Sequence, residues 1–198
     1  VRRIGALGGP VQADELSEGR PSAMVVGSAF SDVRAAMSEM LSGPWLQIRT
    51  TEDLIGLEWA SALMGAVSIG VGFAQAREDV SPGLLAALIS SAVDESATIA
   101  AAAGAKRATF YGLGGYGDLL ASIGMPDRPE VMLGRALAEG ASLEEARKRA
   151  ALRIEAIDLI PRIVAFAERR KVHHKVFGVL ADVLSCELDG ERGIASFF

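Results

Sequence analysis

The sequence predicts a mainly α-helical protein in which an all-helical region follows a partial α/β segment. Two observations predict this fold class. Short apolar runs alternate with helical patterns up to residue 51, and almost every signal from residue 52 onward is helical. The second region is also rich in alanine and glycine, which is typical of closely packed helices. We therefore expect two domains, with residues 1–51 as the end of a larger α/β domain and residues 52–198 as a helical domain.

Three strand-like runs make up the α/β segment. They are "RRIGALGG", "SAMVVGSA" and "WLQIRTT". A helical turn, "ADELSEG", follows the first run, and the helix "SDVRAAMSEML" follows the second, with Ser31 as its expected N-cap. Three strands are too few for a doubly wound domain on their own, so we expect the edge of a larger sheet.

Helix signals follow one another through the rest of the chain. The stretch "DLIGLEWASALMGAVSIGVGFAQAR" holds several glycines, each costing about 0.5–1 kcal/mol in a helix interior, so we expect another backbone to pack closely there. Ser81 and Pro82 start the next helix. Ser142 and Glu145 predict a capping box, and Pro161 is expected in a first turn. The segments "HKVFGVLADVLSC" and "GERGIASFF" are expected to be the last helices.

The composition argues against several functions. The formal net charge is −5, and the one basic cluster, "ERRKVHHK", is typical of a last helical turn, so we expect no nucleic-acid partner. The single cysteine, Cys186, excludes an internal disulfide, and the adjacent His173 and His174 make a poor metal pair, so we expect no metal. Apolar stretches such as "SALMGAVSIGVGFAQA" are too short for a membrane span, and no signal peptide is visible. These features predict a cytoplasmic protein.

Gly112, Gly114 and Gly117 match the spacing of the dinucleotide-binding fingerprint. That fingerprint belongs between the first strand and the first helix of a βαβ unit. Here the glycines lie between two helical segments, and no strand follows them. We therefore expect them to bind no cofactor by that mechanism and to have another role.

Several blocks of the sequence resemble, in order and spacing, motifs of the NAD(P)-dependent glycerol-3-phosphate dehydrogenases. The stretch "GLGGYGDL" resembles that family's "GLAGLGDL", "GGPVQADEL" its "SGPSFAEEV", and "RTTEDLIGLEWASAL" its "YTNDDVIGVELGGAL". The resemblance implies the last strands of a cofactor-binding Rossmann domain, followed by a helical domain like the C-terminal domain of 6-phosphogluconate dehydrogenase. It also implies NAD or NADP as cofactor, a phosphorylated triose as substrate and a role in glycerophospholipid metabolism.

The same resemblance assigns roles on the substrate side. Asp118 stands at the aspartate of the family's "GLGDL", and Ser122 stands where the family has a threonine that contacts the substrate. Asp118 could orient a catalytic ammonium, bind a substrate hydroxyl, or cap the helix that follows it. Met64 falls at the position of the family's catalytic lysine, and a thioether cannot donate a proton. Lys106, the lysine closest in sequence to this loop, is the one obvious substitute.

At the family's phosphate-binding positions this sequence differs from the family pattern, whereas at two cofactor-side positions it agrees with it. Counting without gaps places Pro129 and Glu130 at the family's phosphate-binding arginine–asparagine pair, and Glu130 would repel a phosphate. Arg128, one position earlier, either binds substrate from a shifted loop or is a solvated loop residue. Ala13 and Glu155 match family residues that lie near the cofactor. Glu155 could equally be an acidic residue at a helix N-terminus.

Two functions from different classes follow. The first is a divergent dehydrogenase that interconverts dihydroxyacetone phosphate and glycerol 3-phosphate, or a relative that acts on another small hydroxy or keto compound. The second is a non-catalytic relative that binds a ligand or dimerises. A cation or proton donor beside Met64 would favour the enzyme, whereas a dry apolar pocket there would favour the second function. We also expect a homodimer. An exposed apolar face where further strands should pack would favour association through the sheet edge or through the helices, and a monodisperse monomer in light scattering would contradict it.

Overall fold

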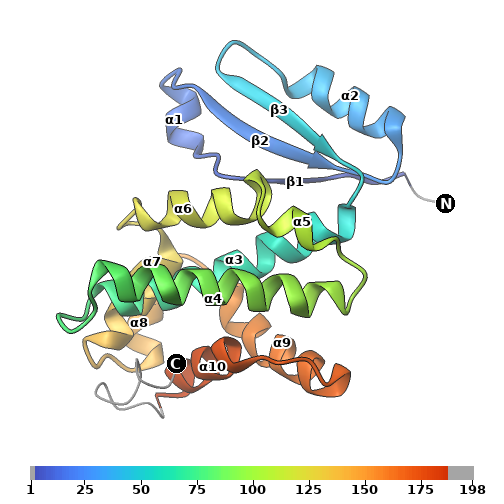
Figure 1. Ribbon diagram of the computed structural model, residues 1–198. Coiled ribbons are helices and arrows are strands. Elements are labelled where there is room, and N and C mark those ends of the chain that lie inside the picture. Colours follow the sequence, from blue (N-terminus) through green and yellow to red (C-terminus); the bar gives the residue numbers. More distant parts are fainter. Residues whose placement is uncertain (1–2, 187–198) are drawn as a thin grey trace.

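The computed structural model of the protein describes residues 3–186, so the expected helix "GERGIASFF" lies outside the described residues. Three strands form one small sheet at one end of the molecule (Figure 1). They are β1 (Ala6–Gly8), β2 (Ser22–Gly27) and β3 (Leu46–Thr51), with α1 (Ala13–Ser17) and α2 (Ser31–Leu41) between them. β1 runs antiparallel to β2, and β2 runs parallel to β3. The partial α/β segment expected from the sequence is confirmed.

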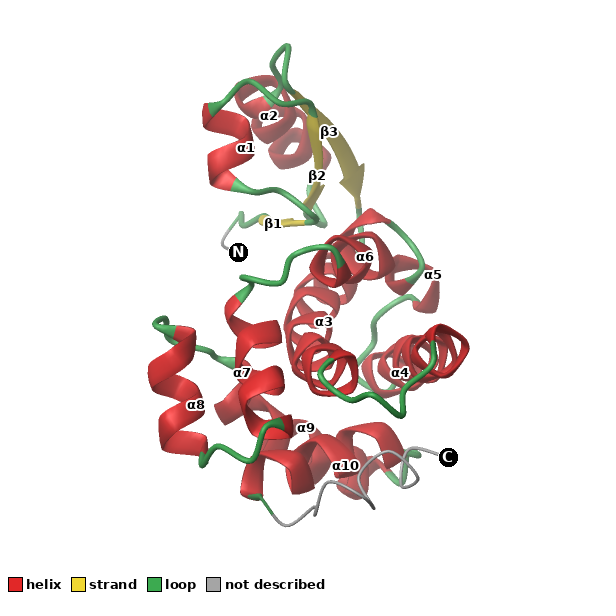
Figure 2. Ribbon diagram, turned by 90° about the vertical axis from the view of Figure 1, so that its left-hand side faces the viewer, coloured by secondary structure: helices red, strands yellow, loops and turns green. Residues whose placement is uncertain are grey.

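The rest of the described chain is helical, as expected, and α3 lies at its centre. Around α3 pack α4, α6, α7 and α9 (Figure 2). In chain order the helices are α3 (Leu54–Gln75), α4 (Pro82–Ala101), α5 (Arg107–Phe110), α6 (Asp118–Ile123), α7 (Pro129–Ala138), α8 (Leu143–Ala150), α9 (Ala156–Arg170) and α10 (Lys175–Ser185). A π-helical turn, η1 (Leu113–Gly117), leads into α6.

The predicted helix starts are partly confirmed. The Ser81 hydroxyl accepts a hydrogen bond from Leu84 N, and Ser142 forms the expected capping box. The prediction for Ser31 is wrong, because this serine is already the first residue of α2 and its side chain makes no cap. The prediction for Pro161 is also wrong. It lies inside α9, because the helix begins at Ala156, earlier than the proline signal indicated.

The glycines of α3 have different surroundings. A Cβ on Gly72 would collide with the backbone of Val131 in α7, so the two helices meet backbone to backbone, as the glycine content predicted. Gly134 in α7 is the reciprocal contact, since a Cβ there would collide with the carbonyl oxygen of Ile69 in α3. Gly65 differs from both, because a Cβ there would meet no atom within 4 Å.

Helices α3 and α4 are each long and apolar enough to cross a membrane by length and composition. α3 has 22 residues, which is longer than the apolar stretch read from the sequence. About half of the most apolar window of each helix is buried inside the structure. That pattern is shared by helices at the core of a fold, and the absence of a membrane span stays a prediction.

The start of α3 is fixed by a buried carboxylate. Asp53 is only 7% exposed and caps the helix by accepting a hydrogen bond of 2.9 Å from Gly56 N. Its other oxygen accepts from Lys106 N at 2.9 Å and from the Thr109 hydroxyl at 2.5 Å. One side chain therefore satisfies a helix N-terminus and also ties α5 to α3.

We expect Asp53→Ala to lower the free energy of unfolding by about 3 kcal/mol, because it removes a cap and leaves buried donors without an acceptor. Urea denaturation followed by circular dichroism measures the loss. Asp79→Ala is the matched control. The Asp79 carboxylate is exposed and pairs with Arg77 at 2.9 Å, so its loss is expected to cost less than about 1 kcal/mol. Equal losses for both variants would contradict the capping role.

Candidate functional site

A cleft of about 520 Å³ separates β1 from the helices. Residues of β1, the middle of α3, the start of α7 and the segment that leads into α9 line it. Its charged lining residues are Glu58, Arg128, Glu130, Arg153 and Glu155. This volume lies within the range of small-molecule sites, about 300–1,000 Å³. By contrast, the cavity among α3, α4 and α10 is apolar and holds only about 20 Å³.

The middle of the glycine-rich turn packs closely against its neighbours. A Cβ on Gly115 would lie 2.5 Å from the carbonyl oxygen of Phe110, and one on Gly114 would collide with Leu57. Both glycines are buried. Close packing of η1 therefore accounts for Gly114 and Gly115, whereas Gly112 is exposed. The turn leads directly into α6, which begins at Asp118.

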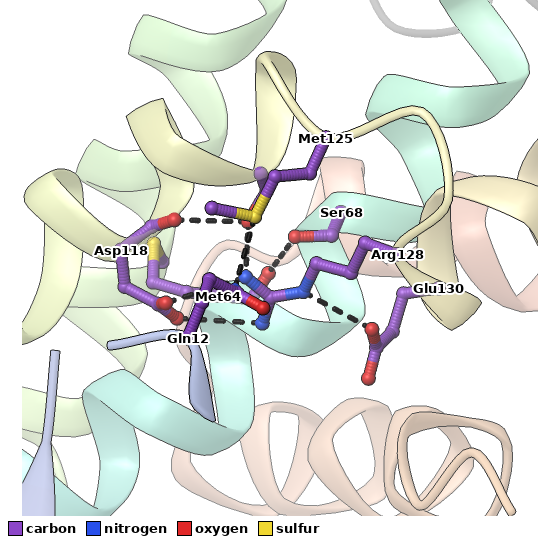
Figure 3. Close-up of polar contacts among 8 residues, drawn as sticks. Gln12, Met64, Ser68, Asp118, Met125, Arg128 and Glu130 are labelled. Carbon is purple, nitrogen blue, oxygen red and sulfur yellow. Dashed lines mark hydrogen bonds and ion pairs between the residues drawn. The ribbon is translucent and has the colours of Figure 1, made fainter. Parts of the chain in front are cut away.

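Arg128 joins the predicted substrate-side residues into one cluster (Figure 3). Its Nη1 and Nη2 atoms lie 3.3 and 3.4 Å from the two carboxylate oxygens of Asp118. Nη1 also donates to the Ser122 hydroxyl, and Nε donates to Glu130 Oε2 at 3.1 Å. The side chains are 18% exposed for Arg128, 14% for Asp118 and 22% for Glu130. The Arg128 side chain is therefore fixed by hydrogen bonds to three neighbouring side chains. The interpretation of Arg128 as a solvated loop residue is wrong.

The alternative role of Asp118 as a helix cap is also wrong. Asp118 is the first residue of α6, the N-cap position belongs to Gly117, and no side chain caps this helix. Ser122 is buried one turn later, and its hydroxyl donates to the Asp118 carbonyl oxygen at 2.9 Å. The helical spacing of four residues therefore places the serine hydroxyl beside the aspartate, so that both can accept from Arg128.

The ion pairs of Arg128 fix its charge. Burial alone would lower the pKa of Arg128, but the charge of Asp118 and its hydrogen bonds, and then those of Glu130, raise it above its usual value. The guanidinium therefore stays a cation at every working pH. It can stabilise negative charge but cannot act as a proton donor.

Met64 and Lys106 do not supply another cation to the cleft. Met64 is fully buried in α3, and its carbonyl oxygen accepts from the Ser68 hydroxyl at 2.8 Å. The next residue, Gly65, lines the cleft in its place. Lys106 occupies the N-cap position of α5 without a side-chain cap hydrogen bond, and its backbone N–H donates to Asp53. It is not one of the residues that line the cleft. Among the described residues, Arg128 is the cation that contacts Asp118.

The two predicted cofactor-side residues are placed differently. Glu155 lines the cleft as the exposed N-cap residue of α9, where its side chain makes no cap hydrogen bond. Ala13 is the exposed first residue of α1 and does not line the cleft. Its neighbour Gln12 reaches the loop before Arg128, with Nε2 3.0 Å from the Met125 sulfur. The sequence offered no signal for Gln12 or Met125.

The cleft offers one group whose chemistry suits the carboxamide of a nicotinamide. The cleft has the volume of a small-molecule site, and the free carboxylate of Glu155 could accept a hydrogen bond from a carboxamide. Between residues 3 and 186, the one Gly-x-Gly-x-x-Gly stretch is a π-helical turn that leads from α5 into α6, and no strand leads into it, so it lacks the βαβ setting of a pyrophosphate-binding loop. No group of His, Cys, Asp and Glu within the described part of the chain could hold a metal ion.

Comparisons with known proteins agree with the resemblance seen in the sequence. A family described as the C-terminus of NAD-dependent glycerol-3-phosphate dehydrogenase matches residues 53–194. A glycerol-3-phosphate dehydrogenase (NAD(P)+) from Paracidovorax citrulli is 35% identical over 144 residues, which is 73% of this chain and 42% of that protein. One from Carboxydothermus hydrogenoformans is 29% identical over 188 residues, 95% of this chain and 56% of that protein. The chain thus spans about half the length of these curated relatives.

Solved structures show the same fold. The crystal structure of glycerol-3-phosphate dehydrogenase from Coxiella burnetii matches with a TM-score of 0.91 and 23% identity. The match covers 98% of this chain and 59% of the other. At that identity the likeness concerns the fold, which includes both the small sheet and the helices that form the cleft.

Proposed function

The chain belongs to the NAD-dependent glycerol-3-phosphate dehydrogenase family, and on that premise we propose that it forms the substrate side of an NAD(P)-dependent dehydrogenase. The reaction interconverts a small hydroxy compound and its ketone, as the family does with glycerol 3-phosphate and dihydroxyacetone phosphate. One observation carries the proposal. A permanent cation, Arg128, is held by Asp118 and Ser122 at the wall of a cleft of substrate size. The division at residues 51 and 52, the cytoplasmic location and the homodimer belong to the same proposal.

The chemistry needs positive charge at the carbonyl oxygen. NAD(P)H, when bound, supplies the hydride to the carbonyl carbon. Negative charge then grows on the oxygen, and a preorganised cation stabilises it. Arg128 fits that role because Asp118 fixes its direction and keeps it charged. The proton comes from a water molecule in the open cleft, because neither Met64 nor Arg128 can give one.

Glu155 is the residue proposed to meet the cofactor, through the carboxamide of the nicotinamide. Its carboxylate lines the same cleft as Arg128. This shared position suits the reaction, because the hydride donor near Glu155 and the carbonyl near Arg128 must meet. Ala13 remains a weaker proposal, because it lies outside the cleft lining. The choice between NAD and NADP depends on the residues that would meet the ribose 2′ position, and neither Glu155 nor Ala13 is assigned to it.

The buried Met64 favours a second candidate function. A fully buried thioether at the family's lysine position is what a ligand-binding relative without catalytic activity would have. In that case the cleft would bind a small molecule without turning it over.

The test uses the longest native polypeptide that carries this sequence. Nicotinamide absorbance is followed after addition of dihydroxyacetone phosphate or dihydroxyacetone, and a Met64→Lys variant is assayed in parallel. We expect the unaltered protein to turn over at least one of the two ketones. Turnover that appears only in the variant would reject the proposal, because it would show that catalysis was lost at Met64.

A further inference from the structure

The guanidinium of Arg128 has almost no free hydrogen-bonding capacity. It has five N–H groups. Nε binds Glu130, Nη1 binds both Asp118 and Ser122, and Nη2 binds the second oxygen of Asp118. A single N–H on Nη2 therefore remains without an acceptor among the described residues. A phosphate group normally takes two parallel N–H donors from an arginine, and Arg128 can offer only one.

The charge balance around Arg128 is negative. Asp118 and Glu130 together carry one more charge than Arg128 can neutralise. Glu58 and Glu155 also line the cleft, and Arg153 is the only other guanidinium in its lining. A phosphate dianion that entered this cleft would meet more carboxylates than cations.

The N-terminus of α7 is also poorly suited to an external anion. This end of the ten-residue helix would ordinarily attract an anion through its free N–H groups. Pro129 is its first residue and has no N–H to give. Glu130 follows in the first turn and turns its carboxylate to Arg128 (Figure 3). A carboxylate of the protein therefore stands in the first turn of α7 and occupies Nε of Arg128, a donor that an incoming anion would need.

We propose that Glu130 is a specificity-determining residue that excludes phosphate from the cleft, so that the substrate is a small uncharged hydroxy ketone or the matching polyol. The single free N–H of Arg128 suffices for one carbonyl or hydroxyl oxygen. This inference rests on the proposed function for its reaction. The predicted exclusion of phosphate can be tested by a binding measurement that requires no turnover.

The test measures inorganic phosphate binding by isothermal titration calorimetry at low ionic strength, on the longest native polypeptide that carries this sequence. Glu130→Gln keeps the shape of the side chain and removes its negative charge, while its amide oxygen can still accept from Nε of Arg128. We expect this variant to bind phosphate at least about 10-fold more tightly than the unaltered protein. Glu58→Gln is the matched control. It removes the same charge from the same cleft without touching Arg128, so its affinity is expected to rise by less than about 3-fold.

Either of two results would overturn the inference. One is saturable phosphate binding by the unaltered protein that matches the affinity of the Glu130→Gln variant. The other is an equal gain in both variants, which would show a general charge effect. Should Glu130→Gln fail to fold by circular dichroism, Glu130→Ala gives the same comparison, because alanine is also neutral and suits a helix.

The dehydrogenase assay separates this inference from the proposed function. A higher kcat/KM for dihydroxyacetone than for its phosphate supports both. A higher kcat/KM for the phosphate supports the proposed function and overturns the exclusion of phosphate. Absence of turnover with either ketone counts against the proposed function, while the phosphate titration still decides the role of Glu130.

Discussion

Gly134→Ala is expected to lower the free energy of unfolding by at least about 3 kcal/mol, the largest loss of stability that we expect from a single methyl group in this chain. A Cβ at residue 134 would collide with the Ile69 carbonyl oxygen and lie 2.8 Å from Phe73 N. Both are backbone atoms of the central helix α3, so no side chain can move aside. The helices would have to separate, and every apolar contact between α3 and α7 would loosen. Thermal and urea denaturation followed by circular dichroism measure the loss.

Gly178→Ala is the matched control for that prediction. Gly178 lies in the middle of α10, and a Cβ there would meet no atom within 4 Å. Alanine is also the better helix former, so this variant is expected to be as stable as the unaltered protein or more stable by up to about 1 kcal/mol. If Gly134→Ala unfolded like the control, the backbone contact between α3 and α7 would be absent in solution.

The elements of this fold could be predicted from the sequence better than their packing. Apolar periodicity and the caps at Ser81 and Ser142 placed most helices correctly, because those signals are local. The glycines of α3 indicated a close backbone neighbour, but not that α7 supplies it opposite Gly72. Nothing local could show this, because the crossing depends on a second glycine, Gly134, more than sixty residues later.

The predicted helix boundaries were wrong where a residue type is compatible with more than one position in a helix. Serine at a helix start is usually a cap, yet Ser31 is already inside α2. Proline usually marks a first turn, yet Pro161 lies inside α9, where the stretch before it is also helical. In both cases the packing of the whole helix outweighs the preference of one residue.

Most of the candidate site that could be predicted comes from one stretch of the chain, and Glu155 is the exception. Asp118, Ser122 and Arg128 lie within eleven residues, and the resemblance named all three. The burial and the hydrogen-bond partners of the Arg128 side chain could not be predicted, because they depend on how the loop before α7 packs against α6. Glu58 and Arg153 were missed for a related reason. A charged residue on a helix or loop has no sequence signal that says whether it faces a cleft or the solvent.

Replacing Arg128 is expected to have the largest effect on activity. In Arg128→Gln, Asp118 and Glu130 lose their cation while they remain mostly buried, so we expect a loss of stability of about 1–3 kcal/mol. If Arg128 stabilises the carbonyl oxygen, turnover by the native polypeptide should fall by about 10²–10³-fold. Arg149→Gln is the matched control. Arg149 pairs with Glu139 at 2.8 Å on the exposed surface, so its loss should change stability by less than about 1 kcal/mol and leave turnover unchanged.

The pH dependence of turnover separates a catalytic cation from a structural one. Asp118 raises the pKa of Arg128 above its usual value, so the unaltered protein should show no alkaline loss of activity from this residue. Arg128→Lys keeps the positive charge, but an ammonium loses its proton at about pH 10. Its turnover should therefore fall as the pH rises through that value, while the folded fraction measured by circular dichroism stays constant. A Lys variant whose activity keeps the flat alkaline profile of the unaltered protein would show that the charge at residue 128 supports the fold and takes no part in the reaction.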